Sequence, residues 1–190
     1  MKFLHLTWED VQNLTRSLAD KIRRRGFIPE VIVAIGRGGF IPARILCDLL
    51  GVKKLVSIGI EYYKDIEERG EEPILVYSMN TDVNNKSILL VDDVSDSGRS
   101  LQLAVNHILK KGVTNLMVVT LHYKPWSTFR PDLFVEEIES WIIYPWEILE
   151  SARIFIRKLR AKGLNNVELL KRLISLGFQL EDIELLLEDV

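Results

Sequence analysis

The sequence of 190 residues is poor in cysteine, in net charge and in long apolar runs. Its single cysteine, Cys47, excludes a disulfide within the chain, and its apolar neighbours predict a buried, inert thiol. No apolar run approaches the roughly 18 residues of a membrane helix, and residues 1–6 are too short for a signal peptide. We therefore expect a protein of the reducing cytoplasm with no membrane partner.

The low net charge and the small number of histidines indicate which partners and metals to expect. The net charge is −2, which gives no electrostatic reason to expect binding to nucleic acid. The three histidines, His5, His107 and His122, are far apart in the sequence and lack the spacing of metal ligands. We therefore expect neither a nucleic-acid partner nor a histidine-based metal centre.

What the chain does have is an alternation of apolar strand-like runs with amphipathic helices. Hydrophobic residues make up 47% of the sequence, which is enough for one packed domain with an appendage. This alternation predicts an α/β fold with a doubly wound, mostly parallel sheet flanked by helices. Strands are expected at residues 31–35, 55–61, 74–78, 88–91, 115–121 and 133–138, and helices at 8–25, 40–50 and 99–111. Thr7 is the expected N-cap of the first helix and Gly26 its stop.

The most informative stretch is residues 88–101, ILLVDDVSDSGRSL, in which an apolar strand is followed by three carboxylates and the start of a helix. Backbone N–H groups and hydroxyls at such a helix start suit a phosphate, and Gly98 allows a close approach. Asp92 and Asp93 would repel that phosphate unless they bind vicinal hydroxyls or a hard cation such as Mg²⁺. Asp96 lies between the two groups, where it could act as a general base or stabilise a developing cation. A simpler alternative is that Asp96 or Ser97 only caps the helix.

A second loop of the same kind follows the strand at residues 31–35 and reads GRGGFIPA. Its glycines permit an unusual backbone and Arg37 adds a fixed positive charge, so the loop suits a polyanion. The alternative is an ordinary tight turn between a strand and a helix.

Together these two loops resemble those of the type I phosphoribosyltransferases, which bind 5-phosphoribosyl 1-pyrophosphate (PRPP). The first resembles the family's PRPP motif and the second its pyrophosphate loop, in the form found in bacterial xanthine-guanine phosphoribosyltransferases. The resemblance implies Asp96 as the catalytic residue, Asp93 as a ligand of Mg²⁺, and Gly36–Arg37 as the place for a cis or strained peptide bond. It further implies PRPP contacts from Arg37, Gly38, Asp92, Asp93, Ser95, Asp96, Ser97, Gly98, Arg99 and Ser100.

The same resemblance suggests the acceptor, a purine base with an oxygen at position 6. It implies that Lys124 donates to this oxygen, that Trp141 stacks on the ring, and that Val94 and Ile142 contact the base. A lysine donates hydrogen bonds but does not accept them, so it favours a carbonyl over the amino group of adenine. Ile143 replaces an acid of the xanthine-guanine pattern, which leaves the choice among hypoxanthine, guanine and xanthine open. The alternative for the nearby aromatics is ordinary core packing, which we favour for Trp146.

The resemblance also implies a domain organisation and an assembly. Residues 1–147 are expected to form the phosphoribosyltransferase domain, with a flexible hood at about 61–85, and residues 148–190 a helical extension. We expect these helices to pack against the core or against a second subunit, with the basic helix at 149–162 against the acidic one at 180–187. The protein is expected to form a homodimer or homotetramer.

Three other functions are compatible with parts of the pattern. A PRPP-responsive regulator without catalysis could share the fold, and an enzyme that uses adenine could share the PRPP motif. An aspartate phospho-acceptor domain is suggested by Asp92 and Asp93 after a strand, but it would not need the phosphate loop directly downstream. The pattern favours a purine salvage transferase whose substrates are PRPP and a 6-oxopurine.

Overall fold

The protein forms two compact units, seen in a computed structural model that describes residues 3–64 and 71–187. One unit comprises Val11–Glu139, and the other joins the residues up to Asp10 with those from Ser140 onward. This division falls between residues 139 and 140, ahead of the boundary at 147 that the sequence predicts for the domains. The predicted domain boundary stays a prediction.

The larger unit is built on a six-stranded sheet with the strand order β4-β3-β2-β5-β6-β7. Its strands are β2 (Val31–Gly36), β3 (Leu55–Lys64), β4 (Glu71–Tyr77), β5 (Ser87–Ser95), β6 (Asn115–Tyr123) and β7 (Leu133–Glu137). All neighbouring pairs are parallel except β3 and β4, which are antiparallel. The predicted doubly wound, mostly parallel α/β sheet is thereby confirmed.

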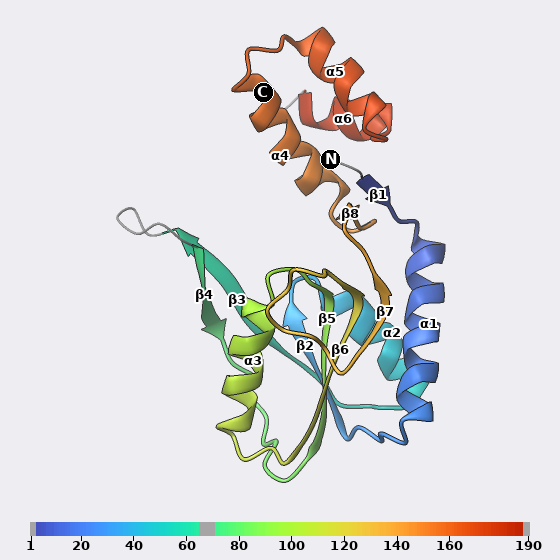
Figure 1. The fold of residues 1–190 in the computed structure, drawn as a ribbon, viewed down its shortest axis with the longest axis vertical. Coiled ribbons are helices and arrows are strands. Elements are labelled where there is room, and N and C mark those ends of the chain that lie inside the picture. The colour runs from blue at the N-terminus through green and yellow to red at the C-terminus, as the bar shows by residue number, and fades with distance from the viewer. Residues whose placement is uncertain (1–2, 65–70, 188–190) are drawn as a thin grey trace. The chain divides into compact units, whose positions relative to one another are not determined.

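Buried β-branched and aliphatic residues explain why the central strands form. Alternate residues of a strand face opposite sides of a sheet, and Val31, Val33 and Ile35 of β2 share one apolar cluster with Leu101 and Ile108. The last two belong to α3 (Arg99–Leu109), which lies on one face of the sheet, whereas α2 (Phe40–Leu50) lies on the other (Figure 1). The central strands are therefore covered on both sides, as parallel strands require.

The strand order creates a topological switch point between β2 and β5. After β2 the chain crosses to β3 on one side, and after β5 it crosses to β6 on the other. Such a switch point separates the loops that follow the two strands, and ligands of open α/β sheets bind there. The loops concerned are the two that the sequence predicts to hold phosphate groups.

Several elements differ in length from their predicted bounds. The predicted strand at 88–91 continues to Ser95, so Asp92 and Asp93 lie within β5 and not in a loop after it. Strands β3 and β4 form a long antiparallel hairpin in the region of the predicted hood, of which residues 65–70 lie outside the described residues. Helix α1 (Trp8–Arg24) begins as predicted, because Thr7 and Asp10 each accept a hydrogen bond from the other's backbone N–H.

The smaller unit contains a short parallel pair of strands and three helices. Strand β1 (Phe3–His5) pairs with β8 (Trp141–Ile143), an arrangement that the sequence did not predict. Helices α4 (Ile148–Arg160), α5 (Asn166–Ser175) and α6 (Leu180–Leu187) contact one another. Their shared core consists of the apolar residues Ile143, Ala152, Ile156, Leu173, Phe178, Ile183 and Leu186. The expected contact between a basic and an acidic helix is thus made by apolar side chains.

Among the described helices, none combines the length and the apolar character that a membrane crossing requires.

The loop after β2 packs closely against the backbone of β5 at Gly39. A Cβ atom at Gly39 would lie 2.3 Å from the carbonyl oxygen of Val91 and 2.8 Å from that of Ile35. Gly39 has an ordinary helical backbone with φ −69°, so its lack of a side chain serves close packing alone. The loop after β2 therefore approaches the backbone of β5 at a distance that leaves no room for a side chain at Gly39.

We predict that Gly39→Ala destabilises the protein by about 3 kcal/mol, because backbone atoms cannot move aside as a side chain could. The control is Gly26→Ala, where φ is +69° and nothing lies within 4 Å, so about 1 kcal/mol is expected from backbone strain alone. Chemical denaturation of both variants measures the difference. Equal losses would show that Gly39 does not pack as described.

Candidate functional site

A pocket of about 360 Å³ opens where β5 ends and α3 begins. It is lined by Tyr62, Asp92, Val94, Ser95, Asp96, Ser97, Gly98, Ser100 and Leu101. All of these except Tyr62 and Leu101 are site residues that the sequence predicts. The strand-loop-helix segment therefore folds into one concave site, because its polar residues are consecutive in the chain.

The turn into α3 depends on Gly98. This residue is the N-cap of the helix and has φ +82°, which favours glycine. There is also no room for a side chain, because a Cβ atom at this position would lie 2.4 Å from the backbone nitrogen of Phe129. As glycine, Gly98 offers no side-chain cap, and the Ser97 hydroxyl accepts the backbone N–H of Arg99 at 3.4 Å. Whether Asp96 and Ser97 do more than cap the helix is therefore left to the proposed function. The first-turn N–H groups of a helix have no partners within the helix, and they attract anions.

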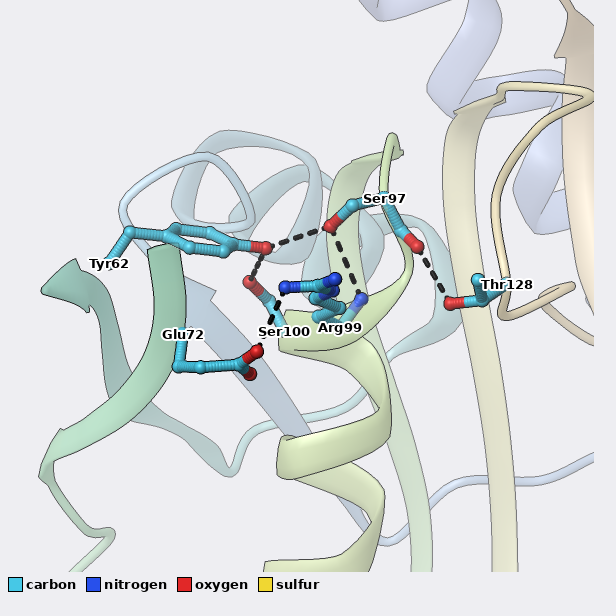
Figure 2. Close-up of polar contacts among 6 residues, drawn as sticks. All are labelled: Tyr62, Glu72, Ser97, Arg99, Ser100 and Thr128. Atoms are coloured by element: carbon cyan, nitrogen blue, oxygen red, sulfur yellow. Dashed lines mark hydrogen bonds and ion pairs between the residues drawn. The ribbon is translucent and has the colours of Figure 1, made fainter. Parts of the chain in front are cut away.

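Two serine hydroxyls of this turn converge on one tyrosine of the hairpin (Figure 2). The hydroxyl of Tyr62 lies 2.9 Å from Ser97 Oγ and accepts a hydrogen bond of 3.0 Å from Ser100 Oγ. On the other side of the turn, Thr128 holds the carbonyl oxygen of Ser97 through its backbone N–H and its hydroxyl. The two hydroxyls that the sequence assigns to a phosphate are thus already arranged around a single oxygen atom.

Arg99, also predicted to contact PRPP, forms an ion pair of 3.0 Å with Glu72 of β4 (Figure 2). Both side chains are at least half exposed, so the pair contributes little stability. Together with Tyr62, it links the β3–β4 hairpin to the start of α3.

Asp92 and Asp93 are buried side by side near the end of β5. Only 9% of Asp92 and 8% of Asp93 is exposed, and each carboxylate accepts the backbone N–H of the next residue, at 3.0 Å and 2.7 Å. Burial and the neighbouring Asp93 raise the pKa of Asp92 well above its ordinary value. Burial likewise raises the pKa of Asp93, from 3.8 to about 6.

The loop after β2 meets this pair of carboxylates. The Gly36–Arg37 peptide bond is cis, at the place that the resemblance marked, and Arg37 is exposed. A Cβ atom on Gly38 would lie 2.3 Å from a carboxylate oxygen of Asp93. The structure therefore brings the two predicted phosphate loops together, with Asp93 between them.

A third group joins the site from the end of β6. Lys124 is only 5% exposed, its backbone N–H donates to the carbonyl of Ser95, and its Nζ lies over the ring of Trp126, 5.5 Å from the centroid. Burial lowers the pKa of Lys124, and the nearby Asp96 acts in the opposite direction. The indole N–H of Trp126 donates to Asp96 Oδ1 at 3.1 Å. Lys124 and Asp96 are thus connected through one side chain.

Comparison with known proteins agrees with this geometry. A family model described as the phosphoribosyl transferase domain matches residues 7–150. The xanthine-guanine phosphoribosyltransferase of Desulfotalea psychrophila is 31% identical over 75% of this chain and 84% of its own, and that of Gluconobacter oxydans is 30% identical over 83% and 91%. The crystal structure of a purine phosphoribosyltransferase from Pyrococcus horikoshii superposes with a TM-score of 0.70 at 36% identity, covering 77% of this chain and 94% of the other.

The chain belongs to the phosphoribosyltransferase family. The recognition made from the two loops is therefore correct, and so is the type of enzyme that it implies, a purine phosphoribosyltransferase.

Not every predicted site residue of this phosphoribosyltransferase lies in the larger unit. Trp141 and Ile142 belong to β8 in the smaller unit, where Trp141 contacts Phe155 edge to face and lies beneath Lys158. Their contacts with a base stay predictions. Trp146 stacks on Tyr144 with ring centroids 4.6 Å apart, which is the packing role that we favoured for it.

Ser95 is predicted to contact PRPP, but its hydroxyl is directed to the neighbouring loop. It lies 2.8 Å from Ser127 Oγ and donates to the carbonyl of Phe129 at 2.7 Å. Ser95 therefore supports the turn that Gly98 and Phe129 form, and its contact with a ligand stays a prediction.

Mg²⁺ fits the donor set of this site. Within residues 3–64 and 71–187, no group of three or more metal-ligating side chains converges. Mg²⁺ in nucleotide sites is commonly held by one or two carboxylates together with phosphate groups of the substrate, and it prefers oxygen ligands. Asp92 and Asp93 supply such carboxylates beside the predicted phosphate loops.

We predict that Asp93→Asn raises the free energy of unfolding, measured in EDTA. The increase should be larger at pH 7.5 than at pH 4. Because the pKa of folded Asp93 is about 6 against an ordinary 3.8, the folded state binds the proton more tightly, and the free energy of unfolding falls as pH rises between these values. The gain above pH 6 should be on the order of 2 kcal/mol. His122, whose pKa burial lowers to about 4, has the opposite pH dependence, so the difference between variant and wild type is the quantity to measure. A difference that does not change with pH would contradict the buried carboxylate pair.

A second prediction concerns Tyr62. An oxygen of a phosphate bound to Ser97 and Ser100 would lie where the Tyr62 hydroxyl lies now, so binding must displace that hydroxyl. Tyr62→Phe should therefore bind ribose 5-phosphate about three- to tenfold more tightly in calorimetry. Glu72→Gln is the control, since it breaks only the exposed pair with Arg99. Weaker binding by Tyr62→Phe would mean that the hydroxyl is a ligand of the phosphate.

Proposed function

We propose that this phosphoribosyltransferase transfers the 5-phosphoribosyl group of PRPP to a 6-oxopurine base. The C1′–O bond to pyrophosphate breaks, a bond forms from C1′ to N9 of the base, and the products are a nucleoside 5′-monophosphate and pyrophosphate. The observation that carries this proposal is the meeting of three groups at one edge of the sheet. These are the loop of Ser97 and Gly98, the Asp92–Asp93 pair, and Lys124 beside Asp96.

The ribose phosphate half of PRPP fits the pocket at the start of α3. We assign its terminal phosphate to the N–H groups and hydroxyls at Ser97, Gly98 and Ser100, where a helix N-terminus favours an anion. We assign its vicinal hydroxyls to Asp92 and Asp93, which accept hydrogen bonds once ionised. The pyrophosphate then extends toward Gly38 and Arg37, whose guanidinium suits a polyanion.

The base half fits beside Lys124 and Asp96. A protonated Lys124 donates to the exocyclic oxygen of the base, which favours hypoxanthine, guanine or xanthine over adenine. Asp96 is the proposed catalytic residue: it takes the proton of purine N7 and stabilises the positive charge that develops on the sugar. The family resemblance adds stacking by Trp141 and contacts from Val94 and Ile142.

Mg²⁺ is the proposed cofactor, and Asp93 is the side chain that we assign to it. When bound, the ion neutralises pyrophosphate oxygens and so improves the leaving group. The residues of the chain hold the sugar and the base in line, and Asp96 takes the proton of the base. We infer that the protein works in the cytoplasm, where its one buried thiol stays reduced.

The test is to incubate the protein with Mg²⁺, PRPP and each of hypoxanthine, guanine, xanthine and adenine, and to measure pyrophosphate release. We predict turnover with at least one oxopurine and little with adenine. Lys124→Met should reduce kcat/KM for the preferred oxopurine about tenfold to a hundredfold, because a charged hydrogen bond is lost. Lys124→Arg, which keeps a charged donor, should retain more activity.

The other outcomes of this assay would each point to a different function. PRPP binding without pyrophosphate release from any base would indicate a regulator. Preferential turnover of adenine would overturn the role of Lys124. Failure to bind PRPP in the presence of Mg²⁺ would remove the proposed function altogether.

A further inference from the structure

We propose that Trp126 is a positioning residue of this reaction, which orients Asp96 through its indole N–H and Lys124 through its ring. The inference rests on the proposed function, because it assigns a purpose to a side chain between the two groups that act on the base. Neither the phosphate motif nor the resemblance points to Trp126.

The geometry comes from two different atoms of one side chain. Nε1 of Trp126 donates to Asp96 Oδ1 at 3.1 Å. Nζ of Lys124 lies over the face of the Trp126 ring, 5.5 Å from the ring centroid. A tryptophan ring attracts a cation to its face and presents a donor at its edge, so it can hold an anion and a cation at once. The loop after β6 thus contributes to both groups that the proposed reaction needs.

The exposure of Trp126 argues against a purely structural role. The side chain is 56% exposed, so much of its large apolar surface is in contact with water. Its polar contacts are made instead with Asp96, on the exposed loop after β5, and with Lys124, at the end of β6. A substitution here should therefore change activity more than stability.

The orientation of Asp96 has a direct chemical consequence. Asp96 is exposed, and a free carboxylate at such a position rotates among several rotamers. A hydrogen bond to Oδ1 fixes this rotation and leaves Oδ2 to receive the proton from the base. Proton transfer requires a heavy-atom separation near hydrogen-bond distance, so a fixed carboxylate raises the fraction of productive encounters.

The ring has a separate consequence for Lys124. Burial lowers the pKa of Lys124, and thus disfavours the protonated form that donates to the base. An aromatic face beneath the ammonium acts against this effect and restrains the long side chain. The N–H and the ring therefore serve different steps, proton transfer and base binding.

The experiment separates these steps by substitution. Trp126→Phe keeps a ring but loses the N–H, so kcat for the preferred oxopurine should fall about tenfold while the KM of the base changes less than about twofold. Trp126→Leu loses both, so the KM of the base should also rise, by about two- to fivefold. Trp126→His keeps a ring N–H and should recover part of kcat. The control is Trp8→Phe, since Trp8 is similarly exposed, at 57%, and has no assigned role.

A double-mutant cycle with Asp96→Asn decides whether Trp126 acts through Asp96. In single-turnover assays, Trp126→Phe should change the rate of the Asp96→Asn enzyme less than about twofold. A kcat of Trp126→Phe equal to that of wild type, or a full tenfold loss that persists in the Asp96→Asn enzyme, would overturn the inference. Absence of turnover in wild type would instead overturn the proposed function. Thermal denaturation of each variant checks that the fold is retained.

Discussion

The constraint on which the site depends is the burial of two neighbouring carboxylates at the end of a central strand. β5 continues beyond its apolar residues into Asp92 and Asp93, and the carboxylate of Asp93 lies where a Cβ on Gly38 of the adjacent loop would have to be. Burial of an anion is costly, and here it raises the pKa of both groups. Such an arrangement is disadvantageous for stability. It is readily understood in a site whose ligands are hydroxyls and a divalent cation, because these stabilise the ionised form.

The sheet topology explains why the polar groups meet at one edge. Parallel strands bring their carboxyl ends to the same side, and the change of direction between β2 and β5 separates the loops that follow them. One loop then leads into α2 and the other into α3, so the two helices that follow lie on opposite faces of the sheet (Figure 1). The third loop, after β6, adds Lys124 and Trp126 beside the second. A dianionic phosphate and an uncharged base can therefore be bound by neighbouring loops of one rigid scaffold.

The parts of the site that the sequence predicts are those carried by consecutive residues. Residues 88–101 fold into the pocket because strand, turn and helix follow each other directly, and the six apolar strands are marked by their own composition. Tyr62 and Trp126 are not predicted, since their hydroxyl and indole N–H meet the phosphate loop only through pairing across the sheet. The pairing of β1 with β8 is missed for a different reason, because strands of three residues give too short a pattern. The position of Trp126, directly after Lys124 and Pro125, could have indicated its role. A tryptophan that lies exposed next to a residue predicted to bind the base has few structural uses.

A bound ligand would affect the hydrogen bonds of Tyr62 and of Trp126 differently. In the proposed complex a phosphate oxygen takes the place of the Tyr62 hydroxyl, so the contacts of this hydroxyl with Ser97 and Ser100 would break when the ribose phosphate binds. The Trp126 N–H holds one oxygen of Asp96 and leaves the other available, so its hydrogen bond can persist while a base is bound. An exposed ion pair between Glu72 and Arg99 also links the hairpin that carries Tyr62 to α3. Under the proposed function, the groups that act on the base are therefore arranged before it binds, whereas Ser97 and Ser100 exchange a partner from the protein for the phosphate.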